Sequence, residues 1–143
     1  MPTTQSDLRK LARLRLREAQ ALFDKKLYDG CEYLAGYVIE LALKARICKT
    51  LNTNDYPDTG ERSRVFKTHN LDDLLFLSGL QRRFDEDKRT NPALFTNWSL
   101  ITPWSEQYRY NPVGSSNKVH AKQVLEALKD QNNGVFSWIK KRW

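Results

Sequence analysis

The chain has 143 residues, 40% of them hydrophobic and 29% charged, a balance that excludes a disordered polypeptide. Its 24 basic and 17 acidic residues give a net charge of +7, which favours anionic partners such as RNA, DNA or nucleotides. The N-terminal MPTTQSDLRK lacks the apolar core of a signal peptide, and no segment is long enough to span a bilayer. We therefore expect one domain covering residues 1–143, cytoplasmic and without a membrane partner.

The first predicted helix starts at capping groups in Thr4–Asp7 and runs to about Lys25. Apolar residues recur along one side of it at helical spacing. Basic residues form a stripe on the other side: Arg9, Lys10, Arg13 and Arg17. Arg15 interrupts the apolar side, and it either extends to solvent or, as we favour, meets Glu40 of the next helix.

The second predicted helix, about Tyr28 to Leu51, is apolar around nearly its whole circumference and is expected to be central and buried. The short connection before it predicts an antiparallel pair with the first helix. One polar stripe interrupts its apolar surface, and four residues at helical spacing form it: Tyr33, Tyr37, Glu40 and Lys44. A buried Glu40 needs a partner, and Lys44 lies one turn away. The stripe is either a structural polar patch or a wall for a nucleotide or RNA phosphate.

The two cysteines, Cys31 and Cys48, both fall in this second helix. A separation of 17 residues places them about 25 Å apart along a continuous helix, too far for a disulfide. We expect two free, buried thiols.

The rest of the chain predicts shorter helices. Residues 52–67 are expected to form a loop, and Asn70, with Asp73 after it, caps a third helix. Residues 92–101 can form a short helix, and residues 103–108 a further turn. The last helix starts near Ser116 and is kinked or broken at residues 132–134. With no strand signal, the fold prediction is all-α: an up-and-down bundle of four or five main helices.

Aromatic residues are concentrated between Phe84 and Trp104, where Phe95 and Trp98 also lie. We expect these rings to fold against the bundle and to leave a partly exposed aromatic surface. Such a surface suits a homodimer interface, because aromatic rings bury large areas.

The order of short motifs resembles the HEPN domain, the small helical bundle of prokaryotic nucleotide-binding proteins and ribonuclease toxins. The pieces that carry the resemblance are Tyr37 to Ala45, Thr68 to Leu75, Arg109-Tyr110 and the helix from about Ser116. It spans nearly the whole chain. The resemblance implies a homodimer, no cofactor, and a small nucleotidyltransferase as a partner.

Catalysis is a separate question, because HEPN ribonucleases place an Arg and, shortly after it, a His near the start of the last helix. Such a pair suits RNA cleavage: the His moves the proton of a 2′-hydroxyl while the Arg holds the phosphate. Arg64 and His69 have the right spacing but precede the third helix. Arg109 has the right position, but the next histidine, His120, lies beyond the family's spacing. The sequence therefore assigns no catalytic residue and no metal site.

Four residues are the predicted nucleotide or RNA contacts: Lys44, His69, Arg109 and Tyr110. Arginine has a planar fork that matches phosphate, and Tyr110 offers a face on which a base can stack. The alternative is that Arg109 pairs with Glu106 or Glu40 and that His69 anchors a helix start. The leading functional hypothesis is a HEPN-like domain that binds a nucleotide, RNA or a partner protein without robust catalysis. A metal-independent endoribonuclease toxin and a purely structural dimerisation module are the alternatives.

Overall fold

The computed structural model describes residues 3–143, apart from the side chains of residues 61 and 62. Within that range it contains helices and no strand; the only extended pairing is an isolated bridge between Thr4 and Asp55. The elements in chain order are α1 (Gln5–Asp24), α2 (Tyr28–Thr50), the 3₁₀-helix η1 (Glu61–Lys67), α3 (Leu71–Leu77), α4 (Gln81–Thr90), α5 (Pro92–Ile101), the 3₁₀-helix η2 (Glu106–Tyr110), α6 (Lys118–Lys129) and α7 (Val135–Lys140). The prediction of an all-α chain is confirmed.

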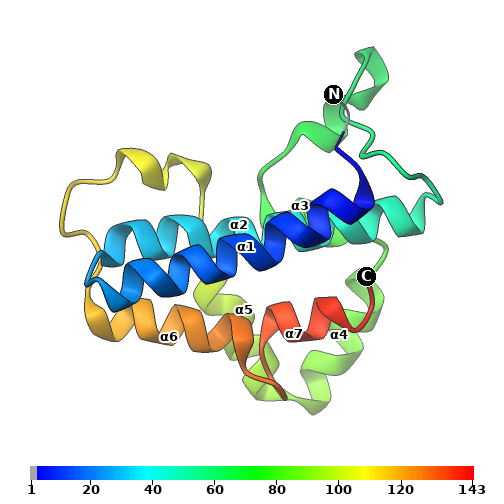
Figure 1. Ribbon diagram of the computed structural model, residues 1–143. Coiled ribbons are helices and arrows are strands. Elements are labelled where there is room, and N and C mark those ends of the chain that lie inside the picture. Colours follow the sequence, from blue (N-terminus) through cyan, green and yellow to red (C-terminus); the bar gives the residue numbers. More distant parts are fainter. Residues whose placement is uncertain (1–2) are drawn as a thin grey trace.

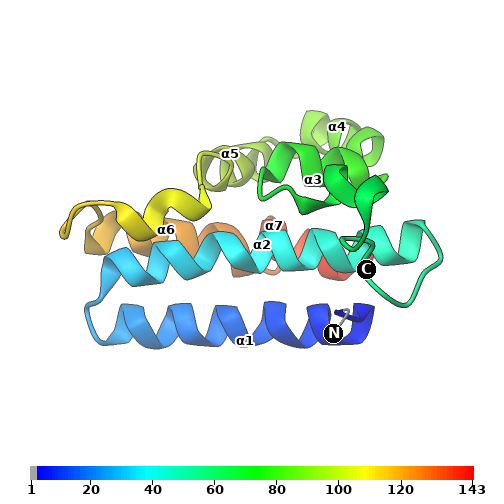
Figure 2. The same ribbon diagram turned by 90° about the horizontal axis from the view of Figure 1, so that it is seen from above.

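Helix α2 is the central element, and the other helices are arranged around it (Figures 1 and 2). Helix α1 runs antiparallel to α2 along one side, after a start at which Thr4 and Asp7 form a reciprocal capping box. On the opposite side of α2 lie α3, α4, α5 and η2, while α6 and α7 run beside it. An element enclosed in this way must be apolar nearly all round, as the sequence of α2 is.

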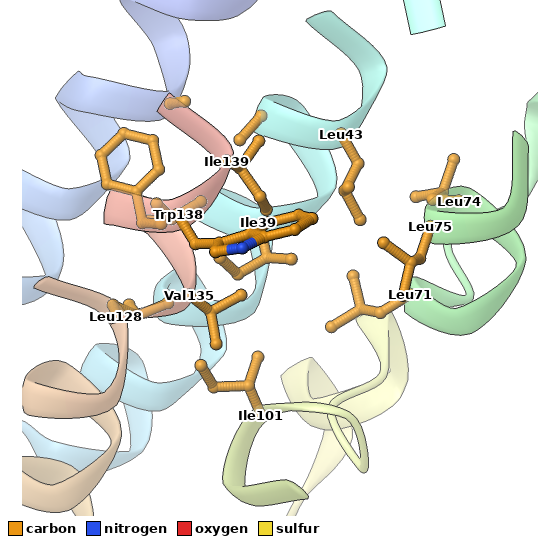
Figure 3. Close-up of a cluster of buried hydrophobic side chains, with 14 of the residues drawn as sticks. Ile39, Leu43, Leu71, Leu74, Leu75, Ile101, Leu128, Val135, Trp138 and Ile139 are labelled. Atoms are coloured by element: carbon orange, nitrogen blue, oxygen red, sulfur yellow. The ribbon is translucent and has the colours of Figure 1, made fainter. Parts of the chain in front are cut away.

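The main core forms where α2 meets α3, α5, α6 and α7 (Figure 3). Ile39 and Leu43 of α2 are fully buried there, against Leu71, Leu74 and Leu75 of α3. Burying one such side chain stabilises the fold by about 1.5–3 kcal/mol. This core fixes α2 and the start of α3 relative to each other, which matters for the polar residues that these two elements carry.

The C-terminal part of the chain forms two helices, α6 and α7, where one kinked or broken helix was expected. The Asp130 carboxylate accepts hydrogen bonds from the backbone N–H groups of Asn132 and Asn133, at 3.2 and 2.7 Å, and so stabilises a turn. A Cβ atom on Gly134 would lie 2.5 Å from the Asp130 and Leu128 carbonyl oxygens, so only glycine fits the start of α7. The described residues thus form more helices than the four or five predicted.

The segment predicted as a loop, residues 52–67, also contains a helix, η1. It is attached to the core by Tyr56, which is only 2% exposed and donates a hydrogen bond of 2.7 Å to the Phe66 carbonyl oxygen.

The aromatic segment folds against the bundle, as expected, but only one of its four rings remains exposed, so the expected aromatic surface is reduced to Phe95. Phe84, Trp98 and Trp104 are 2%, 6% and 7% exposed, and only Phe95 remains open to solvent, at 48%. Helices α4 and α5 turn these rings inward, where Phe84 contacts both Trp98 and Trp138. Composition alone does not reveal which side of a short helix faces the core.

Cys31 and Cys48 are both free and buried, as expected. No helix among the described residues has the length and apolar character needed to cross a membrane.

Candidate functional site

The polar stripe of α2 is present, and it faces η2 and the start of α3 rather than α1. The Tyr33 and Tyr37 hydroxyl groups lie 3.3 Å apart, and their rings pack edge to face. Burial, together with this hydrogen bond, raises the pKa of the Tyr37 hydroxyl, so Tyr37 stays neutral at physiological pH. The stripe therefore contributes two neutral hydroxyl groups, followed along the helix by charged residues.

Glu40 is the centre of the charged part of the stripe. It is 3% exposed, and its two carboxylate oxygens have different partners: His69 Nδ1 lies 2.5 Å from Oε1, and Lys44 Nζ lies 3.6 Å from Oε2. Lys44 also lies over the Tyr56 ring, 5.2 Å from its centroid. The expected ion pair between Glu40 and Lys44 is thus observed, with His69 as a third member.

The expected contact between Arg15 and Glu40 is absent. Arg15 Nη1 instead forms an ion pair of 2.9 Å with Glu18, one turn along α1. The reason is geometric: the Glu40 carboxylate points to His69, which precedes α3, and α3 lies on the opposite side of α2 from α1 (Figure 2).

The sequence Thr68-His69-Asn70-Leu71 explains how His69 reaches Glu40. The Asn70 side chain accepts a hydrogen bond of 3.0 Å from the Asp73 backbone N–H, and Thr68 Oγ1 accepts one of 3.0 Å from the Asn70 backbone N–H. Leu71 enters the core at the first position of α3. The capping groups and the buried leucine hold the backbone at this point, and His69 is directed to α2. It anchors the start of α3, which is the alternative that the sequence left open for His69.

Arg109 and Tyr110 lie at the end of η2 and are exposed, Tyr110 at 71%. The Arg109 guanidinium lies over the Tyr110 ring, 4.8 Å from its centroid. Interactions with Tyr110 and, more weakly, with Tyr33 raise the pKa of Arg109. The alternative ion pair with Glu106 or Glu40 is absent among the described residues, so Arg109 has no carboxylate partner there.

Trp104 attaches this part of the chain to α2. Its indole Nε1–H donates a hydrogen bond of 2.9 Å to the Tyr33 carbonyl oxygen, and its ring packs edge to face on Tyr37. The ring occupies the space that a side chain on Gly36 would need, because a Cβ atom there would lie 2.0 Å from it. Gly36 and Trp104 together thus position η2, and with it Arg109.

One acidic residue of η2 is affected by the charge of His69. Glu106 of η2 has a lowered pKa, chiefly through a hydrogen bond from its own backbone N–H and partly through the charge of His69. The 3₁₀-helix η2, which carries Arg109 and Tyr110, packs on α2, so the two clusters lie on neighbouring elements. We call them together the α2 polar surface, and its residues are Tyr33, Tyr37, Glu40, Lys44, His69, Arg109 and Tyr110.

A second pair of a histidine and a glutamate, missed by sequence reasoning, lies nearer the start of α2. Glu32 is 9% exposed, and its carboxylate contacts His120 Nδ1 in the first turn of α6. Burial raises the pKa of Glu32, and the nearby His120 opposes this. Glu32 was detectable in the sequence as a second acidic residue in an otherwise apolar helix. Its partner was not, because His120 is distant in the chain.

This second pair borders a recess of about 120 Å³, lined by Asp29, Glu32, Tyr108, Asn111, Ser115, Ser116 and His120. The Asp29 carboxylate accepts hydrogen bonds from the backbone N–H groups of Gly114 and Ser116, at 2.7 and 2.8 Å. These bonds lower the pKa of Asp29 and hold the segment before α6 against α2.

Among the described residues, no hydrogen bond joins a candidate catalytic arginine to a histidine. Arg64 is exposed on η1 and forms no hydrogen bond or ion pair with His69, while His69 and His120 each contact a glutamate of α2. Among the described side chains, which leave out those of residues 61 and 62, no group of three or more His, Cys, Asp or Glu residues is arranged to hold a metal ion.

No family model matches the chain, and no curated protein or solved structure shows significant similarity to it. Its function is therefore inferred from its residues and their geometry.

Proposed function

We propose that the chain is a HEPN-like helical domain that binds a nucleotide or RNA phosphate on the α2 polar surface, without robust catalysis. Two observations support this proposal: Lys44 and His69 meet at Glu40 of α2, and Arg109 lies over the exposed Tyr110 ring on η2, which packs on α2. Two of these side chains share the buried Glu40, so their positions are fixed before a ligand arrives. Arg109 alone has no carboxylate partner on this surface and is free to bind an anion.

The chemistry of this surface suits a phosphorylated, aromatic ligand. A guanidinium group can donate two parallel hydrogen bonds to a phosphate, and the Lys44 ammonium adds a point charge. A base can stack on the Tyr110 ring, because that ring is largely exposed. The Tyr33 and Tyr37 hydroxyl groups can donate to a ribose or phosphate oxygen.

We expect weak or absent catalysis because neither histidine is hydrogen-bonded to an arginine among the described residues. An arginine that holds a scissile phosphate must lie beside the histidine that moves the proton. Here the partner of each histidine is a glutamate, Glu40 for His69 and Glu32 for His120.

The test is a titration of the purified protein with a fluorescent adenosine nucleotide. Arg109→Ala should abolish binding and leave the melting temperature nearly unchanged, because Arg109 is exposed and has no ion-pair partner. Arg89→Ala is the matched control, since Arg89 is also exposed and forms no ion pair among the described residues. Equal affinity for the parent and the Arg109→Ala protein would exclude the α2 polar surface as the site.

A metal-independent endoribonuclease is the second candidate, and one observation favours it. Each histidine contacts a buried carboxylate through Nδ1, which leaves Nε2 available as a general base. Incubation of a mixed RNA pool with the protein in EDTA distinguishes the two functions. Cleavage that is lost in His120→Gln or His69→Gln would replace the binding proposal with this one.

The resemblance also suggests a homodimer and a small nucleotidyltransferase as a partner. Light scattering over a range of protein concentrations tests the first, and co-purification with a nucleotidyltransferase encoded next to this chain tests the second. A protein that forms such complexes but binds no nucleotide or RNA would instead be a purely structural interaction module.

A further inference from the structure

Basic residues from α1 meet the C-terminal end of the chain at Trp143. The guanidinium carbons of Arg9 and Arg13 lie 5.7 and 4.8 Å from the centroid of the Trp143 ring. Phe136 of α7 also contacts the Trp143 ring: the two rings pack edge to face, with their centroids 5.5 Å apart. The tryptophan is thus held between α7 and two arginines of α1.

Two cations of α2 converge on the neighbouring residue. Arg46 Nη1 donates a hydrogen bond of 2.5 Å to the Arg142 carbonyl oxygen, and Lys49 Nζ donates one of 3.4 Å to the same atom. Four cations from two helices therefore gather around residues 142 and 143. We call Arg9, Arg13, Arg46 and Lys49 the basic face.

The charge of the basic face is not neutralised within the part of the chain that the structure describes. Its four side chains contact an aromatic ring or a carbonyl oxygen, and none of them forms an ion pair with a carboxylate. Arg9 Nε is also buried without a hydrogen-bond partner. In contrast, Arg82, Arg83 and Lys88 of α4 each pair with an acidic residue of their own helix. Unpaired like charges held close together attract anions.

The basic face is also held in place before any ligand binds. Stacking on Trp143 orients Arg9 and Arg13, and the shared carbonyl oxygen orients Arg46 and Lys49. Long basic side chains lose conformational entropy on binding, and less is lost when contacts within the protein already restrict them. Lys10 and Arg17 extend the positive charge along α1, over roughly 12 Å between positions 9 and 17 at 1.5 Å per residue.

We propose that the basic face binds the phosphodiester backbone of a nucleic acid, at a surface separate from the α2 polar surface. Arg46 projects from α2 about 200° around the helix from Lys44, at about 100° per residue, so the two surfaces face different directions. Phe136 is 1% exposed and Trp143 lies under Arg9 and Arg13, so neither ring is free to enter a lipid bilayer. An extended row of fixed cations without base-reading groups suits a repeating phosphate chain, and binding is independent of sequence.

The experiment measures fluorescence anisotropy of a labelled unstructured RNA and of a labelled DNA duplex at several salt concentrations. The test variant is Arg13→Gln/Lys49→Gln, since both side chains are exposed and the fold does not depend on them. The control is Lys118→Gln/Lys122→Gln, which removes the same charge from exposed positions of α6.

Four phosphate contacts predict that the logarithm of the affinity falls with the logarithm of the salt concentration with a slope of about −3 to −4. Loss of two contacts makes the slope shallower by about 1.5 and weakens binding roughly 30-fold at about 100 mM salt. The control variant should bind like the parent protein.

Three results would overturn the proposal: no binding of either nucleic acid by the parent, equal losses in the test and control variants, or binding only to phosphatidylserine vesicles. The nucleotide titration with Arg109→Ala examines the α2 polar surface alone, so either proposal can fail without the other.

Discussion

Replacing Glu40 by glutamine tests the physical basis of the α2 polar surface. Glu40 is 3% exposed, and its carboxylate is shared by His69 at 2.5 Å and Lys44 at 3.6 Å. Glutamine has nearly the same volume and retains a hydrogen bond to His69, but it leaves the Lys44 ammonium without an anion. The Lys44 side chain is only 13% exposed, so water compensates little for the loss.

The expected cost can be estimated from these contacts. Removing one partner of a fully buried ion pair costs about 3–5 kcal/mol, and a hydrogen bond to a charged group contributes about 1.5–3 kcal/mol. The His69 side chain is 42% exposed, and one hydrogen bond survives, so we expect Glu40→Gln to destabilise the protein by about 2–3 kcal/mol. For a chain of this size, that corresponds to a fall in melting temperature of about 6–12 °C.

The assay is urea unfolding followed by circular dichroism, with Glu18→Gln as the control. Glu18 pairs with Arg15 in α1, but that pair is about one-third exposed, and its loss should cost less than about 1 kcal/mol. Adding Lys44→Met to Glu40→Gln should recover stability, since it removes the unpaired charge. If Glu40→Gln unfolds at the same urea concentration as the parent protein, the pair is not structural and the reasoning is wrong.

Three further changes test other parts of the structure. Gly36→Ala should destabilise the protein by about 1–3 kcal/mol or more, because the new Cβ would lie 2.0 Å from the Trp104 ring. It should also weaken nucleotide binding by displacing η2. Gly30→Ala is the control, because a Cβ there meets only a flexible leucine side chain at 3.2 Å. Burial raises the pKa of the Cys31 thiol to about 12. A thiol reagent should therefore modify the folded protein slowly and the urea-unfolded protein quickly. Fast modification of the native protein would contradict the burial of Cys31. Burial raises the pKa of Glu32 above its ordinary value of 4.5. The folded protein therefore binds the Glu32 proton more tightly than the unfolded chain does. As a result, the contribution of Glu32 to stability falls as the pH rises above 4.5. The difference in unfolding free energy between the parent and Glu32→Gln proteins should therefore vary over this pH range, and parallel pH profiles would refute the shift.

Sequence reasoning succeeded where the information was local. Helical spacing placed Glu40 and Lys44 on one face, and the capping role of Asn70 followed from its position before an apolar run. The charge and spacing of these residues determine such contacts without knowledge of the neighbouring helices.

The contacts that were missed required knowledge of which helix faces which. Arg15 was assigned to Glu40 because α1 and α2 pack together, yet the Glu40 carboxylate points to the other side of α2. The contact between Glu32 and His120 joins α2 to α6, and no local pattern indicates it. The packing of Trp104 on Gly36 was likewise not predicted, because the sequence does not show that Gly36 leaves room for this ring.

The hydrogen bond from Trp104 to the Tyr33 carbonyl oxygen also has a consequence for folding order. It joins positions 71 residues apart, whereas α1 and α2 are consecutive helices joined by a short turn. Contacts between distant positions require closure of a long loop and tend to form late, so the α1–α2 hairpin should form before η2 docks. Conversely, η2 can detach by local unfolding while the helical core remains intact, and this would carry Arg109 away from α2. Hydrogen exchange should therefore be faster in η2 than in the centre of α2, and ligand binding should slow it.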